Sequence, residues 1–507
     1  MQSPLFNFIM KHKLIILFLT LPTILFSQGV NNLWLMGYQS WAGYPFGGTD
    51  VNFINGSADT IFHARQMNFG TTTASISDTS GNLLFYTNGV YIANRFDSLM
   101  VNGDFLNPSF YTNDLANDTF GLDLTQSHII IPMPGQDSIY YLFHCSMDSF
   151  NVNAAIYTRF VYYSKIDMTL DNGKGAVTDK NVVLFTDSIT QGGFSACKHG
   201  NGRDWWIICH QNWSNRYFKF LVTPDSIYGP YTQNIGSIRE GFSPTHVFSQ
   251  DGAKYAFMDG NYDLDVYDFD RCSGMFSNFR HATINDGKYD GHVAFSPNGN
   301  LVYVTSVDRV YQYNLLNPIL DSSQITVAVW DSTYDPASTL LAALFSMIRL
   351  APDNKIYIST GNSTRYLHVI NNPDSVGLAC DLQQHAITLP SICSNSIPYH
   401  PNYFLGADLG SSCDTLTAIN ESIPILGEQI YVYPNPAENY FTVKHSLNEN
   451  QSVQFILFNS TGKEILNKNI FSGSQTIDIN NLSNGIYFWQ ANTSEGNISN
   501  GKLVILK

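Results

Sequence analysis

Short runs of alternating apolar and polar residues fill most of the chain, and a tight polar turn recurs between them. The clearest copies are SISDTSGNLLFYTNG (75–89), FSQDGAKYAFMDG (248–260), FSPNGNLVYVTS (295–306) and LAPDNKIYISTG (350–361). At each turn Asp or Asn can bond its own backbone, and Gly, where present, accepts a positive φ. The apolar run that follows alternates with a period of two. The pattern therefore predicts antiparallel strand pairs.

Copies of this pattern recur about every fifty residues within 29–412, with two weaker ones at 129–144 and 195–210. This spacing fits the blades of a β-propeller and is too long for leucine-rich or ankyrin repeats. Blades bury their faces by stacking into a ring, whose two ends must meet. We expect 33–38 and 402–409 to share one blade, which gives seven blades, with six as the alternative. The Ser-Pro-Asn-Gly turn resembles that of WD-type propeller repeats in exported bacterial proteins, which implies a fold and no particular function.

Strand patterns are shorter and more closely spaced at the end of the chain. Seven of them lie within 429–507, namely IYVYP, YFTVKH, VQFILFN, EILNKNI, QTIDIN, GIYFWQA and KLVIL. Seven strands in fewer than a hundred residues predict a small immunoglobulin-like β-sandwich. The stretch before it, 413–428, is polar with a Pro and a Gly, and we interpret it as a linker. The whole chain is thus predicted to be all-β.

This terminal module resembles the type A sorting domain of the type IX secretion system. The resemblance rests on YPNPA (433–437), FNSTGK (458–463), LSNGIY (482–487) and a basic, apolar tail (502–507). The residues that carry it are Tyr433, Pro434, Asn435, Pro436, Gly462, Gly485, Tyr487, Lys502 and Lys507. It implies docking on the outer-membrane secretion machinery, removal of the module, and a passenger that is released or attached to surface lipopolysaccharide. The alternative is an ordinary accessory sandwich.

The N-terminus carries an export signal. Lys11 and Lys13 precede the apolar run LIILFLTLPTILF, and SQG follows it. A basic patch, a short apolar core and small or polar residues after it are typical of a secretory signal peptide, which we assign to 1–28. The run is short for a membrane-spanning helix, so we expect no transmembrane segment in the mature chain, with a retained anchor as the alternative. Met10 is the candidate true start.

Composition excludes some partners. The formal net charge is −15, which argues against binding to nucleic acid or to anionic membrane surfaces. The seven cysteines include no C-x-x-C pair, so we expect no zinc site, and their odd number leaves at least one unpaired within the chain.

Candidate chemistry is sparse. The sequence has no nucleophile-elbow, zinc-protease, P-loop or dinucleotide motif, and we expect neither a metal nor another cofactor. His246 and His292 fall at different positions relative to the turn, so their side chains should point to opposite faces, against a metal ring. Glu240 is the single glutamate of the middle region and precedes an innermost strand. We predict a polar ligand site at one mouth of the channel, formed by Arg239, Glu240, His246, Asp290, His292 and Arg349.

Three functions fit these observations. We expect an exported propeller, at the cell surface or secreted, that binds or adheres to an extracellular glycan or protein, and we do not assign catalytic residues. The first alternative is a secreted hydrolase or lyase acting on polysaccharide, with Glu240 as general acid or base. The second is a structural surface protein whose propeller only packs against its neighbours.

Overall fold

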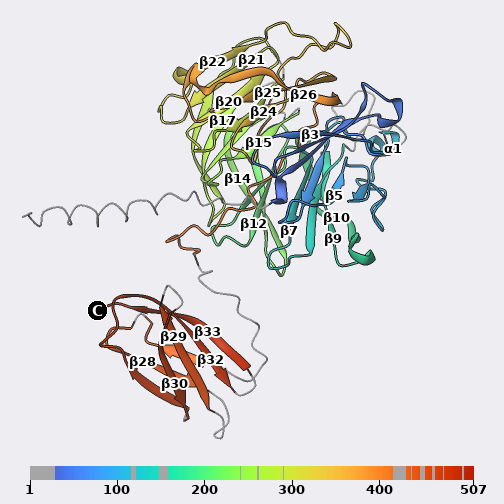
Figure 1. Cartoon of the computed structure of the whole chain (residues 1–507). Coiled ribbons are helices and arrows are strands. Elements are labelled where there is room, and N and C mark those ends of the chain that lie inside the picture. The colour runs from blue at the N-terminus through green and yellow to red at the C-terminus, as the bar shows by residue number, and fades with distance from the viewer. Residues whose placement is uncertain are drawn as a thin grey trace, which may run out of the picture. The chain divides into compact units, whose positions relative to one another are not determined.

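The computed structural model describes residues 29–507 apart from 116–120, 148–157, 240, 242, 260–261, 289, 415–429, 436, 446–451, 460–462, 472 and 494–495. The predicted signal peptide and most of the predicted linker lie outside the described residues. The chain divides into two compact units, one ending at Ser411 and one beginning at Ser412 (Figure 1).

The described part of the first unit forms seven antiparallel sheets in chain order. The first two have three strands each: β1 (Leu33–Tyr38), β2 (Gly47–Asn52) and β3 (Asp59–His63), then β4 (Ala74–Ser77), β5 (Leu83–Thr87) and β6 (Ile92–Asn94). The third and fourth contain β7 (His128–Pro132), β8 (Ile139–His144), β9 (Thr158–Asp167) and β10 (Ala176–Ile189), then β11 (Ser195–Lys198), β12 (Trp205–His210), β13 (Ser214–Val222) and β14 (Ile227–Arg239). Each sheet is one blade of a propeller.

The last three blades have four strands each. They are β15 (Thr245–Phe248), β16 (Lys254–Asp259), β17 (Tyr262–Asp270) and β18 (Met275–Ala282), then β19 (His292–Phe295), β20 (Leu301–Ser306), β21 (Arg309–Asn314) and β22 (Ile325–Val329), then β23 (Ile348–Leu350), β24 (Ile356–Ile358), β25 (Thr364–Ile370) and β26 (Leu382–Cys393). The helical segments are short: η1 (Gly29–Asn31), η2 (Ser40–Ala42), α1 (Phe110–Leu115), η3 (Asp171–Gly173), η4 (Asp321–Ser323) and η5 (Gly377–Cys380).

The recurring turn has the chemistry that its sequence predicts. Between β19 and β20, the Asn298 carboxamide oxygen accepts the Asn300 N–H at 2.9 Å, and Gly299 has φ 67°. The Ser296 hydroxyl oxygen accepts the Leu301 N–H at 3.1 Å. Together these bonds reverse the chain and set the register His292↔Thr305 of the two strands.

Apolar side chains between adjacent blades form the core. Val293 and Val304 belong to the cluster shared with the preceding blade, whereas Ala294 and Tyr303 belong to the cluster shared with the following one. Successive residues of a strand point to opposite faces, so alternation within one short strand supplies both interfaces. This is why the strand patterns are apolar almost throughout.

The first and last blades close the ring by packing against each other, and Trp34 and Phe53 share one buried cluster with Tyr357. Residues 402–409 form no strand, so their predicted place in the first blade was wrong. The preceding segment, 394–400, runs along the channel instead, with Asn395 lining one of its ends and Tyr399 the other. Its Ile397 packs in the same apolar cluster as Trp34 of β1.

The local sequence explains this difference. Proline has no N–H to donate to a ladder, and Pro398 and Pro401 interrupt the chain at this point. Side chains fix the segment in place of a ladder: the His400 Nε2 atom lies 3.0 Å from the Ser75 carbonyl oxygen, and the Tyr403 hydroxyl donates to the Ile130 carbonyl at 2.8 Å. These two contacts tie this part of the chain to the second and third blades.

The second unit contains two sheets with a common core. One has β27 (Ile430–Tyr433), β28 (Tyr440–His445) and β31 (Ser474–Asp478), and the other has β30 (Glu464–Ile470), β29 (Val453–Asn459), β32 (Gly485–Thr493) and β33 (Gly496–Ile505). Phe441 of the first sheet and Phe455 and Trp489 of the second pack in one buried cluster. The unit is the predicted β-sandwich.

Candidate functional site

The channel of the propeller has a polar cavity at the end where its innermost strands begin. This mouth cavity measures about 350 Å³. Its lining comes from the loops before β4, β7, β11, β15 and β19 and from the closing segment 394–400. The polar residues that line it are Thr71, Tyr111, Asp123, Thr125, Gln191, Ser243, Asp290, His292 and Asn395. Because each blade contributes its loop to the same end, residues distant in sequence converge here.

Two carboxylates give the mouth cavity its charge. The exposed Asp123 accepts a hydrogen bond from the Thr71 hydroxyl, and the Asp290 carboxylate lies 3.5 Å from the His292 Nε2 atom. Burial lowers the pKa of His292 to about 4, so its ring is neutral at pH 7, and its Nδ1 atom lies 2.6 Å from the Thr245 hydroxyl. The described lining includes no Lys or Arg. The mouth cavity is therefore acidic.

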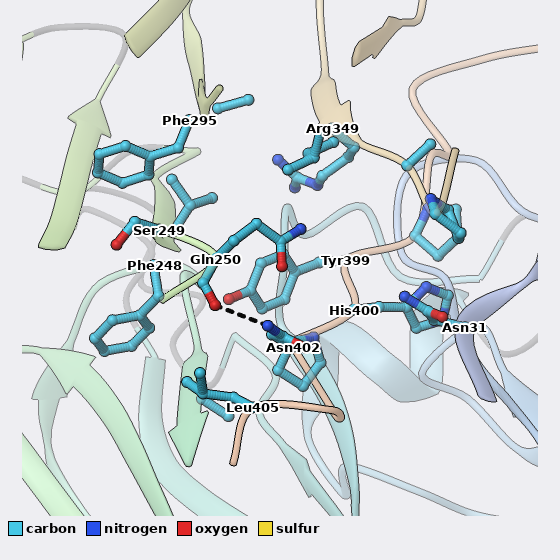
Figure 2. Close-up of a pocket in the computed structure, with 18 of the residues that line it drawn as sticks. Asn31, Phe248, Ser249, Gln250, Phe295, Arg349, Tyr399, His400, Asn402 and Leu405 are labelled. Carbon is cyan, nitrogen blue, oxygen red and sulfur yellow. Dashed lines mark hydrogen bonds between the residues drawn. The ribbon is translucent and has the colours of Figure 1, made fainter. Parts of the chain in front are cut away.

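The opposite end of the channel has a different lining. There a second cavity, the base cavity, measures about 200 Å³ and lies among the ends of the innermost strands and the closing segment (Figure 2). Among the described residues that line it, Arg349 of β23 is the one lysine or arginine, and none is Asp or Glu. Figure 2 shows Arg349 beside Tyr399, whose ring centroid lies 5.5 Å from the guanidinium carbon.

Gln126 crosses the channel between the two cavities. Its side-chain amide donates to the carbonyl oxygens of Phe194 at 2.6 Å and His246 at 2.5 Å. Its carbonyl oxygen accepts from the Arg349 guanidinium at 3.2 Å. One buried residue thus connects four blades at the point where the acidic and basic linings meet.

The residues predicted to form the ligand site do not all come together. Asp290 and His292 line the mouth cavity, and Arg349 lines the base cavity. Arg239 is buried at the end of β14, where its guanidinium pairs with Asp265 at 2.8 Å. His246 is also fully buried, and its Nδ1 atom lies 2.7 Å from the Tyr255 hydroxyl. Glu240 lies outside the described residues.

Sequence reasoning missed Asp123, Gln126 and Tyr399. No short motif contains them, because each takes its position from a loop or the closing segment. Only one signal pointed to Asp123: it precedes an innermost strand, as Asp290 does, but at a different spacing.

In the second unit, the residues of the predicted sorting motif meet around the last strand. The Asn435 side chain donates to the Lys502 carbonyl at 2.8 Å and accepts the Val504 N–H at 2.9 Å. The Ala437 N–H donates to the Val504 carbonyl at 2.8 Å. Asn435 and Ala437 together therefore hold the outer edge of β33 as a paired strand would.

The chain terminus is held by a second motif loop. The Lys507 ammonium donates to the carbonyl oxygens of Ile479 at 2.8 Å, Asn480 at 2.7 Å and Leu482 at 2.5 Å. The Tyr487 hydroxyl donates to the Ser483 carbonyl at 3.0 Å. The remaining motif residues include Tyr433, Pro434 and Gly485, which are exposed, and Pro436 and Gly462, which lie outside the described residues.

The described part of the chain contains no group of three or more His, Cys, Asp or Glu side chains arranged to hold a metal ion. No helix there is long and apolar enough to cross a membrane. Cys272 and Cys413 are in disulfide form, and the other five cysteines are buried thiols: Cys145, Cys197, Cys209, Cys380 and Cys393.

The sandwich belongs to a known class of export module. Residues 431–506 match the family described as the secretion system C-terminal sorting domain. The prediction of a type IX sorting domain is confirmed. The chain is thus a β-propeller passenger with a C-terminal domain that directs it to the outer cell surface or to the medium.

Solved structures of similar architecture are remote in sequence. A functionally unknown protein from Desulfotomaculum acetoxidans is 13% identical with a TM-score of 0.37, and the match covers 73% of this chain and 99% of that one. PorZ, a surface component of the type IX secretion system of Porphyromonas gingivalis, is 12% identical with a TM-score of 0.31, covering 91% and 68%. The β-propeller domain of Cps50 (Swd1) from Myceliophteria thermophila is 9% identical with a TM-score of 0.36, covering 64% and 89%. No curated protein matches the sequence.

Proposed function

We propose that the first unit is an extracellular binding module that takes a neutral glycan at the mouth cavity. The observation that carries this proposal is the convergence of hydroxyl, amide and carboxylate groups from five blades on one cavity of about 350 Å³. Such groups exchange hydrogen bonds with sugar hydroxyls, and the Tyr111 ring offers a surface for the face of a sugar.

The charge of the mouth cavity supports a neutral ligand over an anionic one. Asp123 and Asp290 would repel a sulfated or uronic acid chain, and no described lysine or arginine of the lining offsets them. Carboxylates accept strong hydrogen bonds from neutral hydroxyls. A neutral oligosaccharide therefore fits this lining better than a polyanion.

Residues 1–28 act in this proposal as a signal peptide for crossing the inner membrane, and the mature protein spans residues 29–412. Attachment to surface lipopolysaccharide after removal of the sorting domain is one fate of the passenger, and release to the medium is the other. Localisation of the full chain beside a chain that ends at Asp414, in a host with type IX secretion, tests this route. Equal export of the two chains would contradict it.

A glycan array tests the proposed ligand class. The purified first unit should bind neutral glycans, and Asp123→Asn/Asp290→Asn should lose at least about tenfold in affinity, because two charge-assisted hydrogen bonds are weakened. Lys174→Gln, which changes an exposed residue of another loop, is the matched control. Failure to bind any neutral glycan would overturn the proposal.

Catalysis is the second candidate function. Two carboxylates at one cavity are the groups that a glycosidase uses, and Asp123 and Asp290 are those of the described mouth lining. Release of reducing sugar from a glycan bound on the array, lost in Asp290→Asn with binding retained, would select the hydrolase.

A further inference from the structure

Arg349 differs from the other deeply buried arginines of the propeller. Arg65 pairs with Asp50 at 2.5 Å, and Arg239 pairs with Asp265 at 2.8 Å. Arg271 directs its Nε and Nη2 atoms to carbonyl oxygens. Arg349 is 5% exposed, and no carboxylate of the described residues forms an ion pair with it.

The guanidinium of Arg349 is only partly satisfied. One terminal nitrogen donates to the Ile348 carbonyl at 3.0 Å, and the other donates to Gln126 at 3.2 Å. Its buried Nε atom has no hydrogen-bond partner. An unpaired buried cation costs several kcal/mol unless an anion or further hydrogen bonds compensate it.

Arg349 is the charged group at this position, and the histidines near it are neutral. Burial lowers the pKa of Arg349 to about 10, so the side chain remains a cation at pH 7. His292 and His400, the neighbouring histidines, have pKa values lowered to about 4 by burial and are neutral. The field inside the base cavity is therefore that of a single positive charge in low-dielectric surroundings.

We propose that the base cavity binds a small organic carboxylate, with the carboxylate group on Arg349. A guanidinium matches the planar carboxylate, and one cation matches a monoanion. Phe248, Phe295 and Leu405 line the same cavity and provide apolar contacts for the carbon skeleton (Figure 2). About 200 Å³ is below the range of roughly 300–1,000 Å³ for ligand clefts, so the occupant is a monosaccharide acid or smaller.

The ligand can reach this cavity from solvent. Phe404 and Asn354 belong to its lining, and both are exposed at its rim. The Asn402 side chain donates to the Gln250 carbonyl at 2.7 Å, which fixes the chain just after the closing segment beside the cavity. The site is thus separate from the mouth cavity and does not depend on the glycan proposed there.

Thermal unfolding of the full chain tests the site. Acetate should raise the unfolding midpoint with the logarithm of its concentration, whereas acetamide at the same concentrations should not. Chloride and sulfate are included at matched ionic strength. Equal shifts with the acid and its amide, or shifts with the inorganic anions only, would overturn the proposal.

Two variants separate binding from structure. Arg349→Met should reduce carboxylate affinity at least about tenfold while changing the ligand-free midpoint little, because relief of the buried charge offsets the loss of its hydrogen bonds to Ile348 and Gln126. Asp290→Asn should keep the carboxylate response. A large fall in the ligand-free midpoint of Arg349→Met with an unchanged carboxylate response would assign Arg349 a structural role and contradict the site. If that variant does not fold, the comparison of the acid with its amide on the wild-type chain decides.

Discussion

The two ends of the channel carry opposite charges although the same innermost strands run between them. At the mouth, Asp123 and Asp290 extend from loops that precede the strands. At the base, Arg349 lies within a strand, and the closing segment adds Tyr399 to the lining. The difference shows that the blades supply a frame with little chemistry of its own. What each end can bind depends on a few residues placed before, within or after the innermost strands.

Acid should lower the stability of the propeller more than any of the substitutions below, because it protonates buried histidines that are neutral at pH 7. Burial lowers the pKa of His292 and His400 to about 4 and that of His128 and His210 to about 3. Between pH 6.5 and these values the unfolded chain binds more protons than the folded one, so stability falls as the pH falls. Each histidine contributes about 1.4 kcal/mol per pH unit to this loss. Urea denaturation between pH 4 and 8 measures the slope.

His281 provides a control of opposite sign. Hydrogen bonds from its ring to Asp263 and Asp265 raise the pKa of His281 to about 9. Its stabilisation is complete below about pH 6.5 and is lost as the pH rises toward 9. His281→Gln should therefore lower the free energy of unfolding by a constant amount below about pH 6.5, flatten the profile between about pH 6.5 and 9, and make little difference above pH 9. An unchanged slope between pH 6.5 and 9 would contradict these assignments.

Substitution of Gln126 should destabilise the propeller, because this residue joins four blades between the two cavities. Gln126→Leu leaves the carbonyl groups of Phe194 and His246 and a nitrogen of Arg349 without their partner, and we expect a loss of about 2–4 kcal/mol in the free energy of unfolding. Gln66→Leu, at an exposed position, should stay within about 0.5 kcal/mol. Equal denaturation midpoints for the two variants would show that the bridge does not stabilise the propeller.

Neutralising one acid at the mouth should have a smaller effect that is confined to that end. Asp290→Asn keeps the shape of the side chain and removes its charge, and we expect neutral-glycan affinity to fall about tenfold. The melting midpoint should change little, because the Asp290 side chain is 45% exposed. Titration calorimetry with one neutral glycan taken from the array measures the change. Unchanged affinity would place the glycan elsewhere on the propeller.

The smallest effect is expected for the hydroxyl that orients the other acid. Thr71→Val removes the hydrogen bond to the Asp123 carboxylate but keeps a side chain of similar shape. Loss of one exposed hydrogen bond should lower glycan affinity by less than about fivefold. The same calorimetric titration measures it, and a loss larger than that of Asp290→Asn would reverse the proposed order of the two acids.

Local chemistry explains why much of the fold could be predicted. The Asn298 turn and the alternation of Val293 and Ala294 are encoded by neighbouring residues, so they are visible in the sequence. The same holds for the sorting motif, whose Asn435 lies in a short and ordered set of residues.

The candidate sites depend on residues that only the ring brings together. Gln126 and Arg349 are more than two hundred positions apart, and their hydrogen bond exists because two blades face one channel. Residues 402–409 show the same limit. An aromatic alternation at 402–409 looked like a strand, but the prolines beside it favour side-chain contacts over a ladder.

Array binding by the wild type, Asp123→Asn/Asp290→Asn and Arg349→Met, measured side by side on neutral glycans, shows which end of the channel holds the glycan. We expect the aspartate variant to lose the neutral glycans and Arg349→Met to bind them as the wild type does. Loss of neutral-glycan binding in Arg349→Met, with binding retained in the aspartate variant, would contradict the assignment of the glycan to the acidic mouth.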